Sequence, residues 1–305
     1  MNTLRKFTAG VILKLSTKNF LMPITRHLAK ILITESKHKP LGPEILLLGR
    51  QTVFLTPDQA QQIVVSLGCD LRNTPITYST TSDSPKNTFI SDKSFFSLFC
   101  DSEVLACDVS DYEGADLVFD LSSEIPKSCT SRFDFIYNGS VLDNIFNSAR
   151  ALSNSSSMLK ASGVAFHYEG MLHLGGAYVK FTPEWFFDYF AINNFTECQS
   201  FVCTFNDVHE SDWLLHEWRP YFSRGNQISI TPPLDIRNHA IVISVAEKGL
   251  YSTTEEQPIQ AIYRSDHTPY INLANRSENS LRWAKYREIC GSVYFPGHTL
   301  IGSIT

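Results

Sequence analysis

The order of apolar and polar segments between Arg132 and His167 constrains the fold of this chain more than any other feature. Residues 133–137 read as a short apolar strand, and a small polar turn, a Ser-rich helix and a second apolar strand at 164–168 follow it. Strands that alternate with helices in this way are typical of a largely parallel sheet. Because the carboxyl ends of parallel strands share one edge of the sheet, we expect any ligand site to lie at that edge.

The same alternation extends along most of the chain. Further strands are predicted at residues 44–50, 103–108, 117–120, 195–202 and 240–246. Thr-Pro followed by an acid, with Thr as N-cap and Pro in the first turn, predicts helices that start after Thr56 and Thr182. We therefore expect an α/β, Rossmann-like fold with a seven-stranded, mostly parallel sheet and helices on both faces. Its first strand should contain residues 45–48 and its last strand residues 241–245.

Composition excludes several classes of protein. The chain has 305 residues, 43% of them hydrophobic, which is enough for a large buried core. A net charge of −5 gives no reason to expect a nucleic-acid partner. The seven cysteines are scattered without a CxxC pair, so neither a metal site nor a disulfide framework is indicated. Apolar runs stay far below the ~20 residues of a membrane span, and no signal-peptide cleavage site is recognisable, so a cytoplasmic location is expected.

The chain divides into three predicted regions. Residues 1–39 carry eight Lys or Arg against one acid, with apolar residues near helical spacing, which predicts a basic amphipathic helical cap. Two interpretations of this cap stay open: peripheral contact with a membrane or anionic partner, or packing on the main domain with the lysines in solvent. Residues 44–250 hold the sheet pattern, and residues 251–305 read as a peripheral C-terminal extension.

Several blocks within residues 44–246 resemble class I S-adenosylmethionine-dependent methyltransferases. A strand that starts Phe-Asp and a Leu-Lys-x-x-Gly turn before the next strand are similar to that fold. The blocks that start at Asp111, Asp120, Asn138 and Gly176 look like a bacterial methyltransferase-like group. The resemblance implies S-adenosylmethionine as cofactor and methyl transfer to a small-molecule or sugar-type acceptor. The alternative is a methyltransferase-like binding or scaffold protein without catalysis.

The resemblance also implies where the cofactor would bind. Family members carry an acid and Gly-x-Gly-x-Gly after the first strand, whereas this chain keeps one glycine of that motif, Gly49, followed by Arg50. Asp108 ends the second strand, where an acid accepts the ribose hydroxyls, although a turn or N-cap role is the alternative. Asp120 ends the third strand, near the expected adenine position. Asn138 ends the fourth.

Candidate catalytic residues follow the fourth and fifth predicted strands. His167 could deprotonate an acceptor hydroxyl and Glu169 could orient it, with a half-buried strand residue and a surface carboxylate as the alternative; His173 is a further candidate. Tyr178 matches an aromatic position of the resembled group and could line the acceptor pocket. Asp143 stands where that group has Glu, and the next residue is Asn instead of His, which removes the best proton carrier near neutral pH. Since the cofactor's methyl group is already activated, alignment supplies most of the acceleration and activity without that His is compatible with the sequence.

Overall fold

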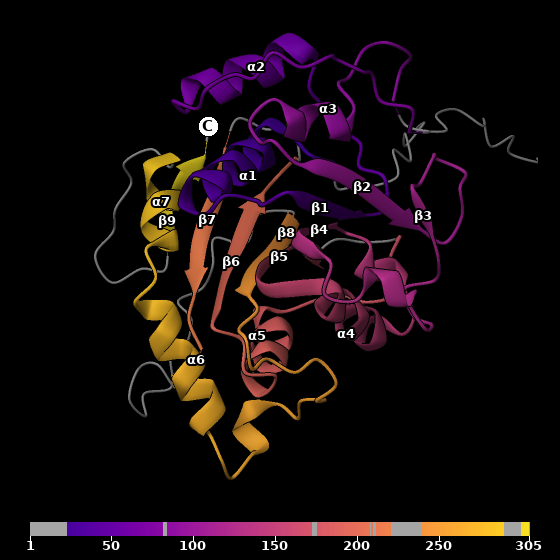
Figure 1. Cartoon of the computed structure of the whole chain (residues 1–305). Helices are drawn as coiled ribbons and strands as arrows, with labels where there is room; N and C mark the ends of the chain where they lie inside the picture. The colour runs from indigo at the N-terminus through magenta and orange to yellow at the C-terminus, as the bar shows by residue number, and fades with distance from the viewer. Residues whose placement is uncertain are drawn as a thin grey trace, which may run out of the picture.

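One nine-stranded sheet runs through the molecule (Figure 1). The computed structural model describes residues 23–81, 84–172, 176–207, 209, 212–220, 239–289 and 300–304. The strands are β1 (Glu44–Leu48), β2 (Glu103–Asp108), β3 (Leu117–Val118), β4 (Phe133–Gly139), β5 (Leu159–Leu172), β6 (Glu197–Phe205), β7 (Trp213–Trp218), β8 (His239–Glu247) and β9 (Leu300–Ile304). The helices are α1 (Arg26–His38), α2 (Pro57–Ser66), α3 (Asp92–Ser97), α4 (Ser148–Met158), α5 (Pro183–Ile192), α6 (Thr268–Glu278) and α7 (Arg282–Ile289).

The strand order is β3-β2-β1-β4-β5-β8-β6-β7-β9. Its first five strands are all parallel and follow the 3-2-1-4-5 order of doubly wound sheets. Among the described strands, β7 and β8 run against the others. The mostly parallel, Rossmann-like sheet that the sequence predicted is therefore confirmed. The strand order reverses between β1 and β4, and this position at the carboxyl edge of the sheet is called here the switch point.

The predicted number of seven strands is wrong. Residues 45–48 and 241–245 do lie in one sheet, as predicted, but β8 is not the last strand of the chain, because β9 follows it. Beyond β6, β7 and β9 add two more strands. The physical reason is that Trp213 and Leu215 of β7 and Ile304 of β9 are fully buried and extend the same apolar core.

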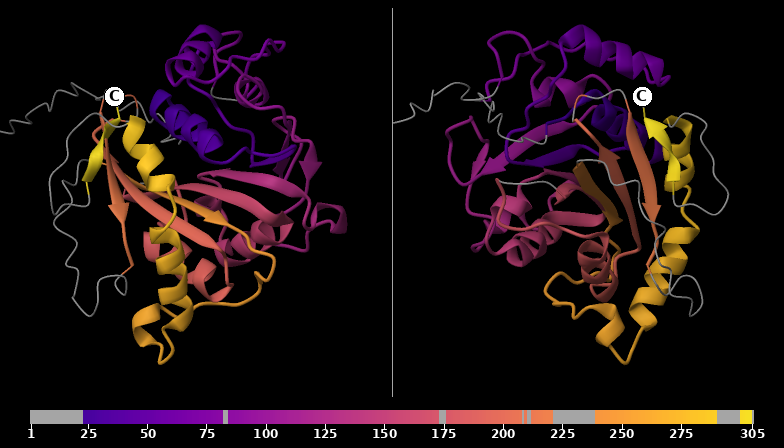
Figure 2. Two further views of the ribbon diagram at one scale, coloured as in Figure 1. Left: turned by 60° about the vertical axis from the view of Figure 1, so that its left-hand side comes forward. Right: turned by 180° about the vertical axis from the view of Figure 1, so that it is seen from behind.

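Two layers of helices cover the sheet (Figure 2). One apolar core lies between the sheet and α1, α2, α3 and α7, and the other lies between the sheet and α4, α5 and α6. Strand β1 feeds both cores, because alternate side chains point to opposite faces: Ile45 and Leu47 face the first core, Leu46 and Leu48 the second. Burial on both faces explains why β1 is a continuous apolar run.

The Thr-Pro signals in the sequence predicted the starts of two helices correctly. Thr56 caps α2, and Gln59 completes a capping box, as the Thr-Pro pattern predicts. Helix α5 begins directly after Thr182, although that hydroxyl makes no capping hydrogen bond. Helix α3 begins after Ser91, whose side chain accepts a hydrogen bond from the backbone N–H of Ser94.

The predicted division into a cap, a main domain and an extension stays a prediction. Helix α1 packs against α7 from the far end of the chain, and four of the eight basic residues of the predicted cap precede residue 23, outside the described residues. No helix in the described part of the chain is long and apolar enough to cross a membrane.

Candidate functional site

The carboxyl ends of β1, β2 and β4 bring together three of the predicted cofactor residues. Leu48, the last residue of β1, pairs with Cys107 on β2 and with Asn138 on β4. Gly49 follows with a φ of 69°, a left-handed conformation that disfavours other residues. A Cβ on Gly49 would stand 3.2 Å from a methyl of Val141 and 3.9 Å from Oδ2 of Asp108. The chain therefore approaches itself closely at the point where the strand order reverses.

Asp108 and Asp120 both stabilise turns, but in different settings. Oδ1 of Asp108 accepts from the backbone N–H of Val109 at 2.6 Å, while Oδ2 faces Gly49. Asp120 is exposed and accepts hydrogen bonds from the backbone and hydroxyl of Ser122 and the hydroxyl of Ser123. The hydrogen bonds from Ser122 and Ser123 lower the pKa of Asp120. Asp108 thus keeps one oxygen directed at the switch point, whereas the contacts of Asp120 serve its own turn.

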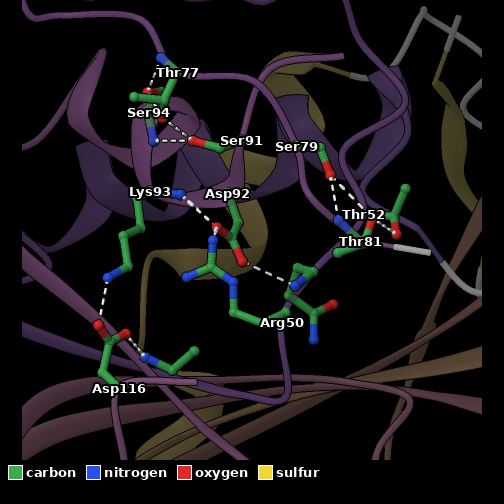
Figure 3. Close-up of polar contacts among 12 residues, drawn as sticks. Arg50, Thr52, Thr77, Ser79, Thr81, Ser91, Asp92, Lys93, Ser94 and Asp116 are labelled. Carbon is green, nitrogen blue, oxygen red and sulfur yellow. Dashed lines mark hydrogen bonds and ion pairs between the residues drawn. The ribbon is translucent and has the colours of Figure 1, made fainter. Parts of the chain in front are cut away.

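The turn after β1 is fastened to α3 (Figure 3). Nη2 of Arg50 lies 2.5 Å from Oδ1 of Asp92, and the backbone N–H of Gln51 donates to Oδ2 of Asp92 at 2.9 Å. The side chains of this pair are 9% and 1% exposed. Burial raises the pKa of Asp92, and the charge of Arg50 opposes that shift. The guanidinium of Arg50 is therefore committed to an internal ion pair, although the sequence suggested it as a cofactor contact.

Gln51 is a functional candidate that sequence reasoning missed. Its Nε2 donates to the carbonyl of Leu48 at 2.9 Å, and its Oε1 lies 2.2 Å from where a Cβ on Gly139 would stand. The side-chain amide consequently covers Gly139 between β1 and β4. A glycine directly after Asn138 was the available signal, because glycine in a strand often marks a close approach of another group.

Four buried polar side chains lie beside the carboxyl edge of the sheet. They are called here the strand-end cluster: Asn138, Asp143, His167 and Glu169. Nδ2 of Asn138 donates to Oε1 of Glu169 at 2.6 Å and contacts Nδ1 of His167 at 3.2 Å. The backbone N–H of Leu142 also donates to Oε1 of Glu169, at 3.0 Å. These bonds fix the 3-10 turn η2 (Leu142–Asn144) to β4 and β5. That turn follows Val141, which packs on Gly49.

Burial sets the protonation of the cluster. It lowers the pKa of His167 to about 3 and raises the pKa of Glu169 well above its usual range, with the charge of Asp143 adding to the latter shift. Burial also raises the pKa of Asp143, against the hydrogen bond that Ser140 donates to it. Nε2 of His167 and Oε2 of Glu169 have no hydrogen-bond partner among the described residues. Such orphaned buried atoms are rare in proteins, and they adjoin the switch point.

The predicted catalytic residues occupy contrasting surroundings. His167 and Glu169 are fully buried in β5, so neither the half-buried strand residue nor the surface carboxylate of the sequence interpretation describes them. The ring of His167 stacks on Phe186 with centroids 5.0 Å apart. Tyr178 is 73% exposed, and its backbone N–H donates to the carbonyl of Asp143 at 2.8 Å. His173 lies outside the described residues. Their catalytic roles stay predictions, and among these candidates Tyr178 presents its ring to solvent.

Comparison with known proteins yields likeness in structure only. No protein-family model and no curated protein matches the chain. A SAM-dependent methyltransferase from Thermotoga maritima, described as a possible histamine N-methyltransferase, is 11% identical with a TM-score of 0.39, over 73% of this chain and 88% of that one. The 1,6-didemethyltoxoflavin-N1-methyltransferase of Burkholderia thailandensis is 12% identical with a TM-score of 0.32, over 73% and 79%. Sequence identities and TM-scores of this size indicate a likeness in fold alone. The named activities are those of the two solved proteins.

Proposed function

We propose that the protein binds S-adenosylmethionine at the carboxyl edge of β1, β2 and β4 and transfers its methyl group to a small-molecule acceptor. The observation that carries the proposal is the switch point itself, where Gly49 takes a left-handed conformation and Asp108 directs one carboxylate oxygen toward it. Ligands of open α/β sheets bind in the crevice at such points. The resemblance in the sequence supplies the identity of the cofactor.

The residues present fit the cofactor in part. A carboxylate at the end of β2 suits a pair of ribose hydroxyls, and the left-handed φ of 69° at Gly49 is the kind of conformation that glycine gives a ligand-binding turn. The side-chain amide of Asn138 already contacts Glu169, His167 and the backbone N–H of Val141. We therefore assign Asp108 and Gly49 to the cofactor, and assign Asn138 to holding the loop beside it.

Methyl transfer asks the protein mainly for alignment. The cofactor supplies an activated methyl group, so holding the acceptor in line provides most of the acceleration. His167 and Glu169 are fully buried, and burial holds His167 neutral by lowering its pKa to about 3. An acceptor that is nucleophilic without a protein base is therefore favoured. A sugar hydroxyl, which needs such a base, is supported less well.

One observation favours the alternative of a binding or scaffold protein without catalysis. The side chain of Gln51 covers Gly139, and a methyl of Val141 packs within 3.2 Å of the Cβ position of Gly49. Both glycines therefore face the protein's own side chains. In this alternative the fold is kept while the cofactor is bound weakly or not at all.

Calorimetric titration with S-adenosylmethionine tests the proposal. Asp108→Asn should weaken binding by about 1–3 kcal/mol, the cost of leaving polar partners unpaired, which is about 5- to 150-fold in Kd. Asp101→Asn is the matched control, because it removes the same charge before the start of β2, where the side chain is 87% exposed and pairs with Arg72. Formation of S-adenosylhomocysteine with a pool of small-molecule acceptors then tests turnover.

The outcomes separate the two functions. Equal affinity for wild type and Asp108→Asn would remove Asp108 from the site. Binding without product from any acceptor pool would favour the non-catalytic alternative. An absence of binding at millimolar cofactor would reject the cofactor site, since a free energy of about 4 kcal/mol or less corresponds to a millimolar Kd.

A further inference from the structure

A pocket beside α4 and α5 has none of the proposed cofactor residues in its lining. It is about 380 Å³ in volume and lies between α4, α5 and residues 257–260 of the chain after β8. Figure 1 shows α4 and α5 on the same side of the sheet, with the orange chain after β8 looping past them. This volume falls within the about 300–1,000 Å³ typical of small-molecule sites.

The wall that closes the pocket is fixed in place. Asn193, after α5, donates from Nδ2 to the carbonyl of Glu256 at 3.0 Å, and the hydroxyl of Tyr189 donates to the carbonyl of Thr254 at 2.8 Å. Arg150 of α4 pairs with Glu255 at 3.1 Å. The chain after β8 is thus tied to both helices. A wall held by side chains from two helices makes the pocket a preformed one.

The lining combines acids with aromatic rings. Glu184 and Asp188 lie four residues apart on α5 and therefore share one side of the helix. Trp185 and Tyr189 add an indole and a phenol, and Pro258 also lines the pocket. The ten lining residues include two acids and no Lys, Arg or His. Apolar walls with a few convergent polar groups are the usual composition of a ligand site.

Asp188 is the buried acid among the lining residues. It is 6% exposed, and one carboxylate oxygen accepts from the backbone N–H of Ala261 at 3.0 Å. The other oxygen has no hydrogen-bond partner among the described residues, and the residue lines the pocket. Glu184 has no ion pair within the described residues. Arg264 interacts with Asp188 electrostatically, but it lies outside the lining and donates to the carbonyl of Gln257 at 3.4 Å.

We propose that this pocket binds a small organic cation, an ammonium group with an apolar or aromatic body. The ammonium would satisfy the open oxygen of Asp188 and the carboxylate of Glu184, and the body would lie against Trp185 and Tyr189. Aromatic faces attract cations, and desolvated pairs of this kind are the strongest. The site is independent of the proposed cofactor and of methyl transfer, so it stands or falls separately.

Three probes of similar shape and different charge test the site on the full chain. Phenethylammonium should bind with at least about tenfold lower Kd than neutral 2-phenylethanol, and 3-phenylpropionate should bind most weakly. Calorimetry gives the affinities. Tryptophan fluorescence reports the place, because the phenethylammonium-induced change should disappear in Trp185→Phe.

Variants of the two acids complete the test. Glu184→Gln combined with Asp188→Asn should remove the preference for phenethylammonium, while keeping an acceptor for the backbone N–H of Ala261. Glu124→Gln, an exposed acid elsewhere, is the matched control and should bind as wild type does. If the double variant fails to fold, Glu184→Gln alone, at a half-buried position, should raise the Kd for phenethylammonium at least about fivefold. Equal binding of the three probes, unchanged binding in the acid variants, or no binding at all would overturn the proposal.

Discussion

Buried ionisable side chains are fully paired at the amino edge of the sheet and incompletely paired at its carboxyl edge. Near the amino end of β6, four side chains form what is called here the junction network: Glu35 of α1, Glu197 of β6, and Arg282 and Tyr286 of α7. Nε of Arg282 lies 2.8 Å from Oε1 of Glu197, a second guanidinium nitrogen pairs with Glu35, and the hydroxyl of Tyr286 donates to Glu35 at 3.0 Å. All four carboxylate oxygens of the two glutamates have a partner.

The strand-end cluster at the carboxyl edge is buried throughout but incompletely paired. Oε2 of Glu169 and Nε2 of His167 lack hydrogen-bond partners within the described residues. Burying polar groups without partners costs stability, so a region that serves stability alone should pair them, as the junction network does. This difference in pairing indicates that the two regions have different roles. The junction joins segments from both ends of the chain, and the cluster supports the loop beside the candidate site.

The largest effect should follow from breaking the junction. Arg282→Met removes a fully buried guanidinium and leaves Glu35 and Glu197 without their cation. Stranding buried charges in this way costs about 3–5 kcal/mol in the free energy of unfolding. Chemical denaturation measures the loss. Arg72→Met is the control, because its pair with Asp101 is exposed and should contribute about 0–1 kcal/mol. A loss below that of the control would show that the junction is not an energetic unit.

A smaller effect should appear at the strand-end cluster on acidification. The pKa of His167 is about 3 in the folded protein, below the about 6.5 of an unfolded His. Its stabilising contribution is therefore full above pH 6.5 and is lost as the pH falls toward 3. Between pH 6.5 and 5, wild type should lose about 1.6 kcal/mol more than His167→Gln. Denaturation curves at both pH values measure this, and parallel losses in the two proteins would contradict a buried neutral imidazole.

Much of the fold could be predicted from the sequence, because its signals are local. The apolar runs of β1, β4 and β8 are buried on both faces and therefore read as strands without help from their neighbours. Thr56 and Pro57 mark the start of α2 for equally local reasons. The outer strands β7 and β9 were missed, because their burial depends on pairing between segments far apart in the chain. The mixed composition of Trp213–Trp218 carries no clear signal of its own.

Only the site residues that end or directly follow a strand could be predicted from the sequence. Gly49, Asp108 and Asn138 meet because each ends or follows a neighbouring parallel strand, which the order of segments already implies. The pairing of Arg50 with Asp92 depends on how α3 packs over the turn, and nothing near Arg50 in the chain announces it. The full burial of Glu169 likewise depends on the loop after β4, whose backbone N–H groups fold back onto the carboxyl group.

The smallest effect should come from Glu169→Gln, and the same substitution at Glu35 is its comparison. Glu169→Gln should change the free energy of unfolding by less than about 1 kcal/mol, because burial favours the uncharged acid and an amide resembles it, with Asn138 and the N–H of Leu142 still donating to an oxygen. Glu35→Gln should cost about 1.5–3 kcal/mol, since it removes a charge that Arg282 and Tyr286 both contact. Denaturation of the two variants under one buffer gives the comparison directly. Equal losses would mean that Glu169 is ionised and that the contrast between the two regions does not hold.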